Sequence, residues 1–148
     1  MLETNIKIFY GALPCGYNLK KWKKSETDKC TICCAKETIL HLLYECKYAQ
    51  EIWSIVEDAL QLDVTRYEVF MGHDIDAINH VFSLILYYIY KDWLILSLEN
   101  KKRQRSPNLL TFSNEIKQHA KLYASTSIPV MQSTAEMLEK NHNKPLVT

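Results

Sequence analysis

Three cysteines and a histidine between residues 30 and 46 have the spacing of metal ligands. The pattern is Cys30-x2-Cys33, followed after seven residues by His41-x4-Cys46. A tight Cys-x2-Cys turn directs two sulfur atoms toward one point, and a histidine and a cysteine near a helix end can supply two further ligands. Thiolate and imidazole are ligands that Zn²⁺ prefers, at distances of about 2.0–2.3 Å. The spacing therefore predicts a zinc site formed by Cys30, Cys33, His41 and Cys46.

A zinc ion held by four side chains has no open position for an activated water molecule, so the predicted role is structural rather than hydrolytic. Two alternatives stay open at this point. The cysteines could be buried neighbours without a metal, because free cysteine is often buried. Cys34 could replace Cys33 as a ligand, although Cys-x2-Cys is the commoner spacing. Cys15 lies far upstream and is expected to be a free thiol outside the site.

The spacing of His41 and Cys46 constrains the local backbone. Each residue of an α-helix advances by about 100°, so two residues five positions apart point about 140° away from each other. Both side chains can therefore reach one ion only if the helix loosens or breaks. We expect this irregularity near Cys46, with a second helix beginning there.

Lysines and aromatic residues alternate in the segment that leads into the cluster. Residues 19–36 carry a net charge of +4, whereas residues 45–76 carry −6 and residues 101–105 carry +4. Lysines neutralise phosphates, and exposed aromatic rings stack on unpaired bases. The candidate nucleic-acid-binding residues are Lys20, Lys21, Trp22, Lys23 and Lys24. The alternative is that Trp22 packs beneath the metal loop while the lysines are merely solvated.

Hydrophobic periodicity predicts an all-α fold, a small helical domain with an N-terminal Cys-Cys-His-Cys zinc knuckle. The chain has 148 residues with only 3 glycines and 4 prolines, which disfavours an all-β chain. The helical period is clearest over residues 46–62. We divide the chain into a zinc-binding segment with flanking helices (1–62), a helical region (63–126), and a short helix with a loose tail (127–148).

Other helices are expected on both sides of this segment. A short helix should end at Pro14, and a long buried helix should span residues 77–101 rather than cross a membrane, because Lys91 and Asp92 interrupt its apolar run. The connector 63–76 could include a brief extended piece. A third helix is expected over 107–124 with Ser106 as N-cap, and a last one should begin at a capping box formed by Ser133 and Glu136.

Sequence motifs of the common enzyme classes are missing from the chain. It contains no glycine-rich phosphate loop, no His-Glu-x-x-His and no Gly-x-Ser-x-Gly. Clustered cysteines in odd number favour a reducing compartment, with thiols that hold metal rather than form disulfides. We therefore expect a non-enzymatic protein of the nucleus or cytoplasm.

Residues along the first third of the chain resemble a known family. The stretches "LPCGYNLKKW" and "CTICCAKETILHLLYECKYAQEIW" are similar to the zinc-binding segment at the C-terminal end of non-LTR (LINE-type) retrotransposon reverse transcriptases. The matching residues are Leu13-Pro14, Asn18-Leu19, Cys30, Cys33, Glu37-Thr38, His41-Leu42-Leu43, Cys46 and Trp53. Cys15 departs from the pattern, in which Thr or Ser is expected.

The resemblance implies a non-catalytic, zinc-binding accessory domain of a reverse transcriptase that contacts RNA template or target DNA. Its other partner would be the remainder of the reverse transcriptase polyprotein. A zinc-scaffolded protein–protein interaction module is the alternative, because the aromatic helix "VFSLILYYIYKDWLIL" could expose an apolar patch and self-associate.

Overall fold

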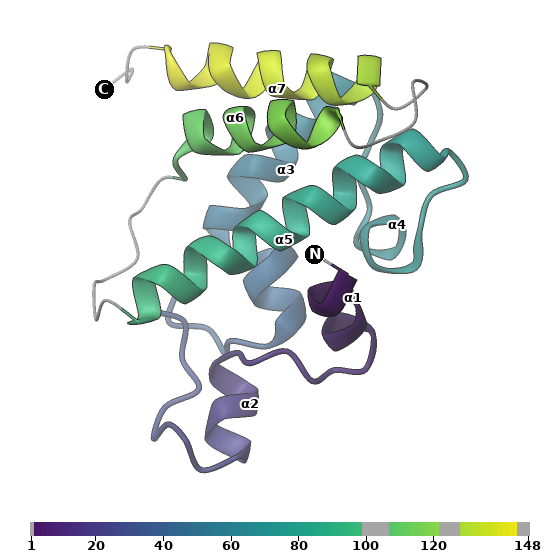
Figure 1. Ribbon diagram of the computed structural model, residues 1–148. Helices are drawn as coiled ribbons and strands as arrows, with labels where there is room; N and C mark the ends of the chain where they lie inside the picture. Colours follow the sequence, from purple (N-terminus) through teal and green to yellow (C-terminus); the bar gives the residue numbers. More distant parts are fainter. Residues whose placement is uncertain (1, 99–106, 122–127, 145–148) are drawn as a thin grey trace. The chain divides into compact units, whose positions relative to one another are not determined.

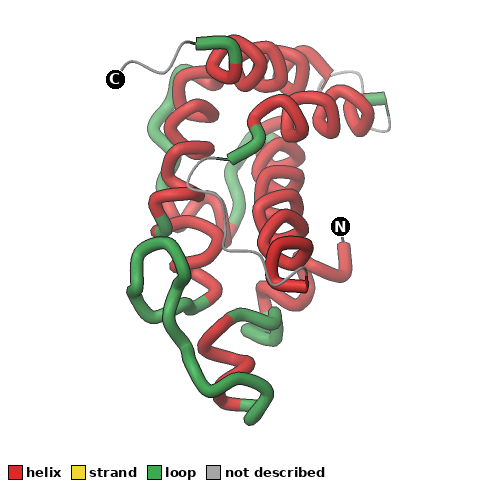
Figure 2. Tube along the Cα trace, turned by 90° about the vertical axis from the view of Figure 1, so that its left-hand side faces the viewer, coloured by secondary structure: helices red, strands yellow, loops and turns green. Residues whose placement is uncertain are grey.

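The computed structural model describes residues 2–98, 107–121 and 128–144. Figures 1 and 2 show helices joined by loops, and the described residues contain no strand, so the predicted all-α fold is confirmed. The elements are α1 (Leu2–Phe9), α2 (Gly16–Lys21), the π-helix η1 (His41–Glu45), α3 (Lys47–Leu60), α4 (Arg66–Met71), α5 (Asp76–Leu98), α6 (Leu109–Ala120) and α7 (Ile128–His142).

The chain forms two compact units. The first comprises residues 1–50 and 86–106, and the second comprises residues 51–85 and 107–148. Helices α3 and α5 each contribute residues to both units. The first unit holds the cysteine and histidine cluster, and the second holds the α6–α7 pair. The three-segment division expected from the sequence stays a prediction.

Helix α3 follows the predicted apolar stripe. Ile52, Trp53 and Val56 are buried, whereas Glu51 and Ser54 on the other face are exposed. The Trp53 ring meets the ring of Phe82 from α5 edge-to-face, with centroids 5.6 Å apart. Edge-to-face contact is a preferred geometry for aromatic pairs. Trp53 of α3 therefore packs against α5.

Helix α5 is apolar along most of its length, and Lys91 and Asp92, which interrupt its apolar run, both have partners. Within the first unit, Asp92 accepts a hydrogen bond from the Tyr48 hydroxyl. The Lys91 ammonium lies 5.5 Å from the centre of the Tyr88 ring, and Lys91 itself is exposed. No helix in the described part of the chain is both long enough and apolar enough to cross a membrane.

Two expectations for the N-terminal half are wrong. Helix α1 ends at Phe9, before Pro14, because Gly11 adopts a left-handed conformation with a φ of 64° and its N–H binds the Ile8 carbonyl. Residues 66–71 form α4 rather than an extended piece. The Thr65 side chain and Glu68 form a capping box that starts this helix, and capping overrode the β propensity of the segment.

The α6–α7 pair corrects two expected helix starts. Asn108 caps α6 through its side chain, which accepts from the Thr111 N–H, and the expected cap Ser106 lies outside the described residues. Helix α7 begins at Ile128, so Ser133 is in its interior and forms no N-terminal capping box. Pro129 explains the earlier start, because proline fits the first turn of a helix.

Helices α6 and α7 lie side by side within the second unit (Figure 1). Phe112 and Ile116 of α6 and Met131 and Leu138 of α7 are buried. The Ser113 hydroxyl donates to the Ala135 carbonyl at 2.8 Å across this contact. Hydrophobic burial and a satisfied buried hydroxyl together stabilise the pair.

Candidate metal centre

The first two candidate ligands lie on a tight turn. The Cys30 N–H donates to the Ala35 carbonyl at 2.7 Å, and the Cys34 N–H donates to the Cys30 carbonyl at 2.9 Å. Cys34 has a φ of 59°, a left-handed conformation that reverses the chain. An isolated antiparallel bridge between Lys29 and Lys36 closes the base of this turn. We call residues 28–37 the cysteine loop.

The other two candidate ligands lie at the ends of a π-helix. The Cys46 N–H donates to the His41 carbonyl at 2.8 Å, which closes a turn of five residues instead of four. Because this turn is wider than that of an α-helix, it brings the Cys46 side chain closer to the side of the helix on which His41 lies. Cys46 then has a ψ of 142°, and α3 begins at Lys47. The expected break at Cys46, followed by a new helix, is confirmed.

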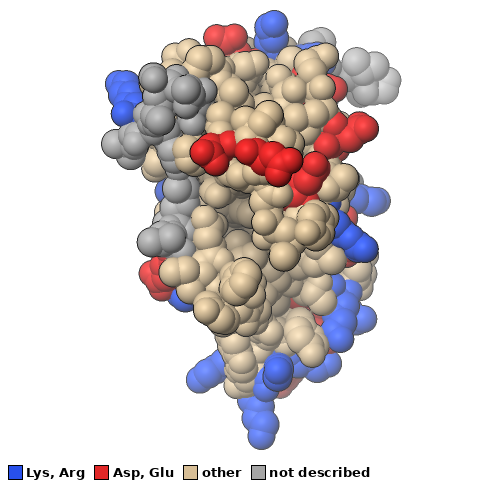
Figure 3. All heavy atoms as spheres, turned by 90° about the vertical axis from the view of Figure 1, so that its right-hand side faces the viewer, with Lys and Arg blue, Asp and Glu red and all other residues tan. Residues whose placement is uncertain are grey.

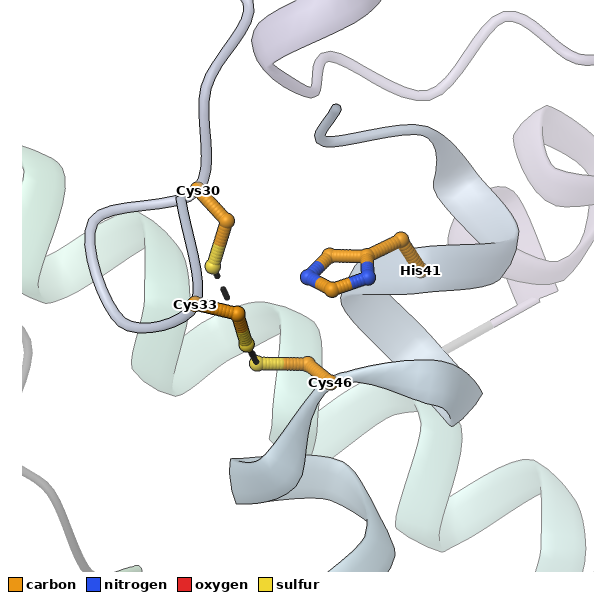
Figure 4. Close-up of side chains that lie close together, drawn as sticks. All are labelled: Cys30, Cys33, His41 and Cys46. Carbon is orange, nitrogen blue, oxygen red and sulfur yellow. Dashed lines mark hydrogen bonds between the residues drawn. The ribbon is translucent and has the colours of Figure 1, made fainter. Parts of the chain in front are cut away.

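The four side chains converge on one point (Figure 4). One ligand atom from each of Cys30, Cys33, His41 and Cys46 lies within 4.8 Å of all the others. The Cys33 and Cys46 sulfurs are 3.4 Å apart, and those of Cys30 and Cys46 are 3.8 Å apart. Cys30, His41 and Cys46 are buried, and Cys33 is half-buried. The turn and the π-helix thus bring all four predicted residues together.

Close packing of the sulfurs perturbs their protonation. The hydrogen bond with Cys46 lowers the pKa of Cys30, and the same hydrogen bond raises the pKa of Cys46. Two thiolates at this distance repel each other, so the pair retains a proton between them. A bound divalent cation would remove this repulsion and allow all three sulfurs to ionise.

An unpartnered buried atom shows that the cluster fits a metal. The Nε2 atom of His41 is buried and has no hydrogen-bond partner, and Figure 4 shows the imidazole facing the cysteine sulfurs. An unsatisfied buried polar atom is costly unless a ligand completes it. The Ile32 N–H approaches the Cys30 sulfur at 3.4 Å, an arrangement that favours thiolate. Three soft sulfurs and an imidazole match the ligand preference of zinc.

The remaining two cysteines lie outside the cluster. Cys34 is exposed and is not among the converging residues, so the structure favours Cys33 over Cys34 at this position. Cys15 is buried immediately before α2 and forms no disulfide, in agreement with its expected state as a free thiol. Burial raises the pKa of Cys15.

Glu37 and Asn18, which are among the residues of the family resemblance, position the elements around the cluster. Glu37 is 4% exposed, and its carboxylate accepts from the Gly16 N–H at 2.9 Å. The Asn18 side chain donates to the carbonyls of Gly11 and Leu13 at 2.9 and 2.8 Å. These polar side chains satisfy backbone groups that no helix satisfies. Asn18 lies between the apolar residues Tyr17 and Leu19, a signal that could have identified it, whereas Glu37 lies between Lys36 and Thr38 and gives no such signal.

The predicted nucleic-acid-binding residues lie on and directly after α2. Lys20, Lys21, Lys23 and Lys24 are exposed, and Lys side chains gather over the lower end of Figure 3, where Figure 1 places α2. Trp22 is 42% exposed, so it does not pack beneath the cysteine loop as the alternative held. Nearby Tyr17 is 39% exposed. Cations and accessible rings thus share this surface, which we call the basic surface.

Comparisons with curated proteins and with solved structures give no match. A comparison with known families matches residues 6–53 to the family described as zinc-binding in reverse transcriptase. The matched range contains the whole cysteine loop, all four converging side chains and the basic surface. The resemblance found in the sequence is confirmed over this range: residues 6–53 are similar to the zinc-binding segment of reverse transcriptases.

Proposed function

We propose that Cys30, Cys33, His41 and Cys46 hold one Zn²⁺ ion with a structural role. The support is the convergence of their ligand atoms within 4.8 Å, together with the unpartnered Nε2 of His41. When bound, zinc supplies four strong bonds that link the cysteine loop to the π-helix, and four protein ligands leave no site for substrate. The Cys46 sulfur lies 3.4 Å from the Cys33 sulfur and 3.8 Å from the Cys30 sulfur, and such thiol contacts are far weaker than bonds to a metal.

We further propose that the chain is a non-catalytic, nucleic-acid-binding accessory domain of a retrotransposon reverse transcriptase. The observation that carries this proposal is the basic surface, where four exposed lysines flank the exposed ring of Trp22 within the matched segment. The hydrogen bond from Gly16 to the Glu37 carboxylate attaches α2 to the end of the cysteine loop. Zinc would then fix the loop on which the basic surface rests.

Binding of single-stranded RNA and DNA at several salt concentrations tests this function. The logarithm of the affinity should fall linearly with the logarithm of salt concentration, with a slope of about −0.7 for each phosphate neutralised. Replacement of Lys20, Lys21, Lys23 or Lys24 by alanine should reduce the slope by about that amount for each lysine that contacts a phosphate. Lys140→Ala, which removes an exposed lysine of α7, is the matched control. Binding that is absent, or equally salt-dependent in the lysine variants, would contradict the proposal.

A zinc-scaffolded protein interaction module is the second candidate. The aromatic residues Phe82, Tyr88 and Trp93 of α5 are buried, which removes most of the apolar patch expected there. Phe9 and Tyr10, at the end of α1, are 73% and 76% exposed and favour this candidate instead. Sedimentation of the full chain distinguishes the two: a concentration-dependent oligomer that Phe9→Ser abolishes supports self-association, and a monomer at high concentration opposes it.

A further inference from the structure

We propose that Tyr17, Lys20, Lys21 and Asp28 form a subsite for one unpaired nucleobase, and that Asp28 selects bases with an exocyclic amino group. This inference rests on the proposed nucleic-acid-binding function and adds the ligand class and a selecting residue. The candidate residues from the sequence included the two lysines but neither Tyr17 nor Asp28.

The four residues line one shallow depression of about 420 Å³ in the first unit. This volume lies within the range of pockets that hold small ligands. The walls differ in chemistry: one aromatic ring, two cations and one carboxylate. A nucleotide has matching parts, because its base offers a flat face and a polar edge while its phosphate carries negative charge.

Tyr17 offers the base its stacking surface. The Lys36 ammonium lies 4.3 Å from the centre of the Tyr17 ring and occupies one face of it. A base would therefore stack on the opposite face of the ring, and Tyr17 lines the depression. Bases inside a duplex are stacked on each other and cannot lie flat on a protein side chain, so the ligand class is single-stranded nucleic acid.

Buried Glu37 holds Tyr17 and Asp28 in place. Its carbonyl accepts from the Tyr17 N–H at 2.9 Å, and its N–H donates to the Asp28 carbonyl at 2.7 Å. The aromatic ring and the carboxylate thus project from backbone segments fixed to a single residue that is 4% exposed. A site held in this way loses little conformational entropy when a ligand binds.

Asp28 provides the hydrogen-bond acceptor. Its Oδ2 lies 3.8 Å from the Lys20 Nζ, which is a long distance for an ion pair. The carboxylate therefore retains the capacity to accept a hydrogen bond. A carboxylate accepts from the amino group of cytosine, whereas thymine and uracil present a carbonyl oxygen at that position and are repelled. Cytosine and thymine are both single-ring bases, so their ratio of affinities depends less on stacking strength than a comparison with a purine would.

The first test compares Tyr17→Ala with Tyr17→Phe in the zinc-loaded full chain. Fluorescence anisotropy measures binding of short labelled oligocytidylate, as DNA and as RNA. Tyr17→Ala should weaken binding by about 5-fold to 150-fold, while Tyr17→Phe should bind as the parent does, because stacking needs the ring and not the hydroxyl. The salt slope should be unchanged in both variants. Tyr67→Ala, which removes another exposed tyrosine, is the control.

The second test uses Asp28→Asn and compares oligocytidylate with oligothymidylate. The parent should prefer cytosine, and the variant should lose most of that preference, because the amide can also donate to thymine. Affinity for thymine should stay equal or rise, since a negative charge has been removed. Asp63→Asn, a change at an exposed aspartate of the second unit, should leave the ratio unchanged. Equal zinc content in all variants verifies the fold.

The outcomes separate the subsite from the function on which it rests. If no oligonucleotide binds the parent protein, both fail. If binding depends on the lysines but not on the Tyr17 ring, the subsite is wrong and the function stands. If Tyr17 matters while Asp28→Asn leaves the cytosine-to-thymine ratio unchanged, the selective role of Asp28 is overturned.

Discussion

The cysteine loop of the first unit and the α6–α7 pair of the second unit are stabilised by different kinds of interaction. In α6 and α7, buried apolar side chains follow the helical period, and a single hydroxyl bond from Ser113 supplements them. The cysteine loop has no helix, and its Cys30 and Cys33 sulfurs meet the His41 imidazole and the Cys46 sulfur beside a set of backbone hydrogen bonds. A segment with few apolar side chains thus needs a strong local bond, which a metal ion can provide.

Removal of zinc should produce the largest difference in stability between the cysteine loop and the α6–α7 pair. Structural zinc binds small domains with about 10–16 kcal/mol, which is also folding free energy. Chelation should therefore expose the amides of residues 28–46 to rapid hydrogen exchange, while amides in α6 and α7 keep their protection. Hydrogen exchange followed by mass spectrometry measures both regions in one experiment. Equal loss of protection in both would show that the two regions do not differ as described.

A mutation that creates a cavity in the second unit should lower the stability of the protein and leave zinc binding unchanged. Leu138 is fully buried, so Leu138→Ala should lower the free energy of unfolding by about 2–5 kcal/mol. Zinc affinity should be unaltered, because the ligands lie in the first unit. Urea denaturation and competition with a zinc indicator measure the two quantities. Weakened zinc binding in this variant would contradict the view that the two regions are stabilised independently.

Gly16→Ala should have a smaller effect, confined to the attachment of α2. A Cβ atom at this position would lie 3.0 Å from the Glu37 Cβ and 3.3 Å from the Asp28 carbonyl oxygen. We expect a loss of about 1–3 kcal/mol in stability, as for other overpacked sites. Glu37→Ala removes the Oε1 atom that would lie 3.2 Å from this Cβ and the acceptor of the Gly16 N–H, so the double variant should lose less than the sum of the single changes. Additive effects would mean that Glu37 does not position α2.

The sequence was informative where spacing maps directly onto geometry. The ligand pattern predicted which residues converge, and the mismatch between five residues and the α-helical period predicted the irregular backbone that the π-helix provides. The buried apolar face of α3 was also predictable, because burial in this helix follows the 3.6-residue period.

Helix ends and buried polar residues were harder to predict. Gly11 stopped α1 before Pro14 could, and Pro129 started α7 upstream of Ser133. Several residues near each end have suitable capping chemistry, and tertiary packing decides between them. The role of Glu37 depends on α2 lying against the end of the cysteine loop, a contact between residues that are 21 positions apart. No local pattern encodes such a contact.

Metal analysis of purified protein tests the central claim most directly. We predict one equivalent of zinc in the parent chain and in Cys34→Ser, and loss of that equivalent in Cys30→Ser, His41→Ala and Cys46→Ser, because only the residues of the converging set bind the ion. Undiminished zinc in the Cys30→Ser and His41→Ala variants would contradict the assignment and, with it, the role proposed for the cysteine loop.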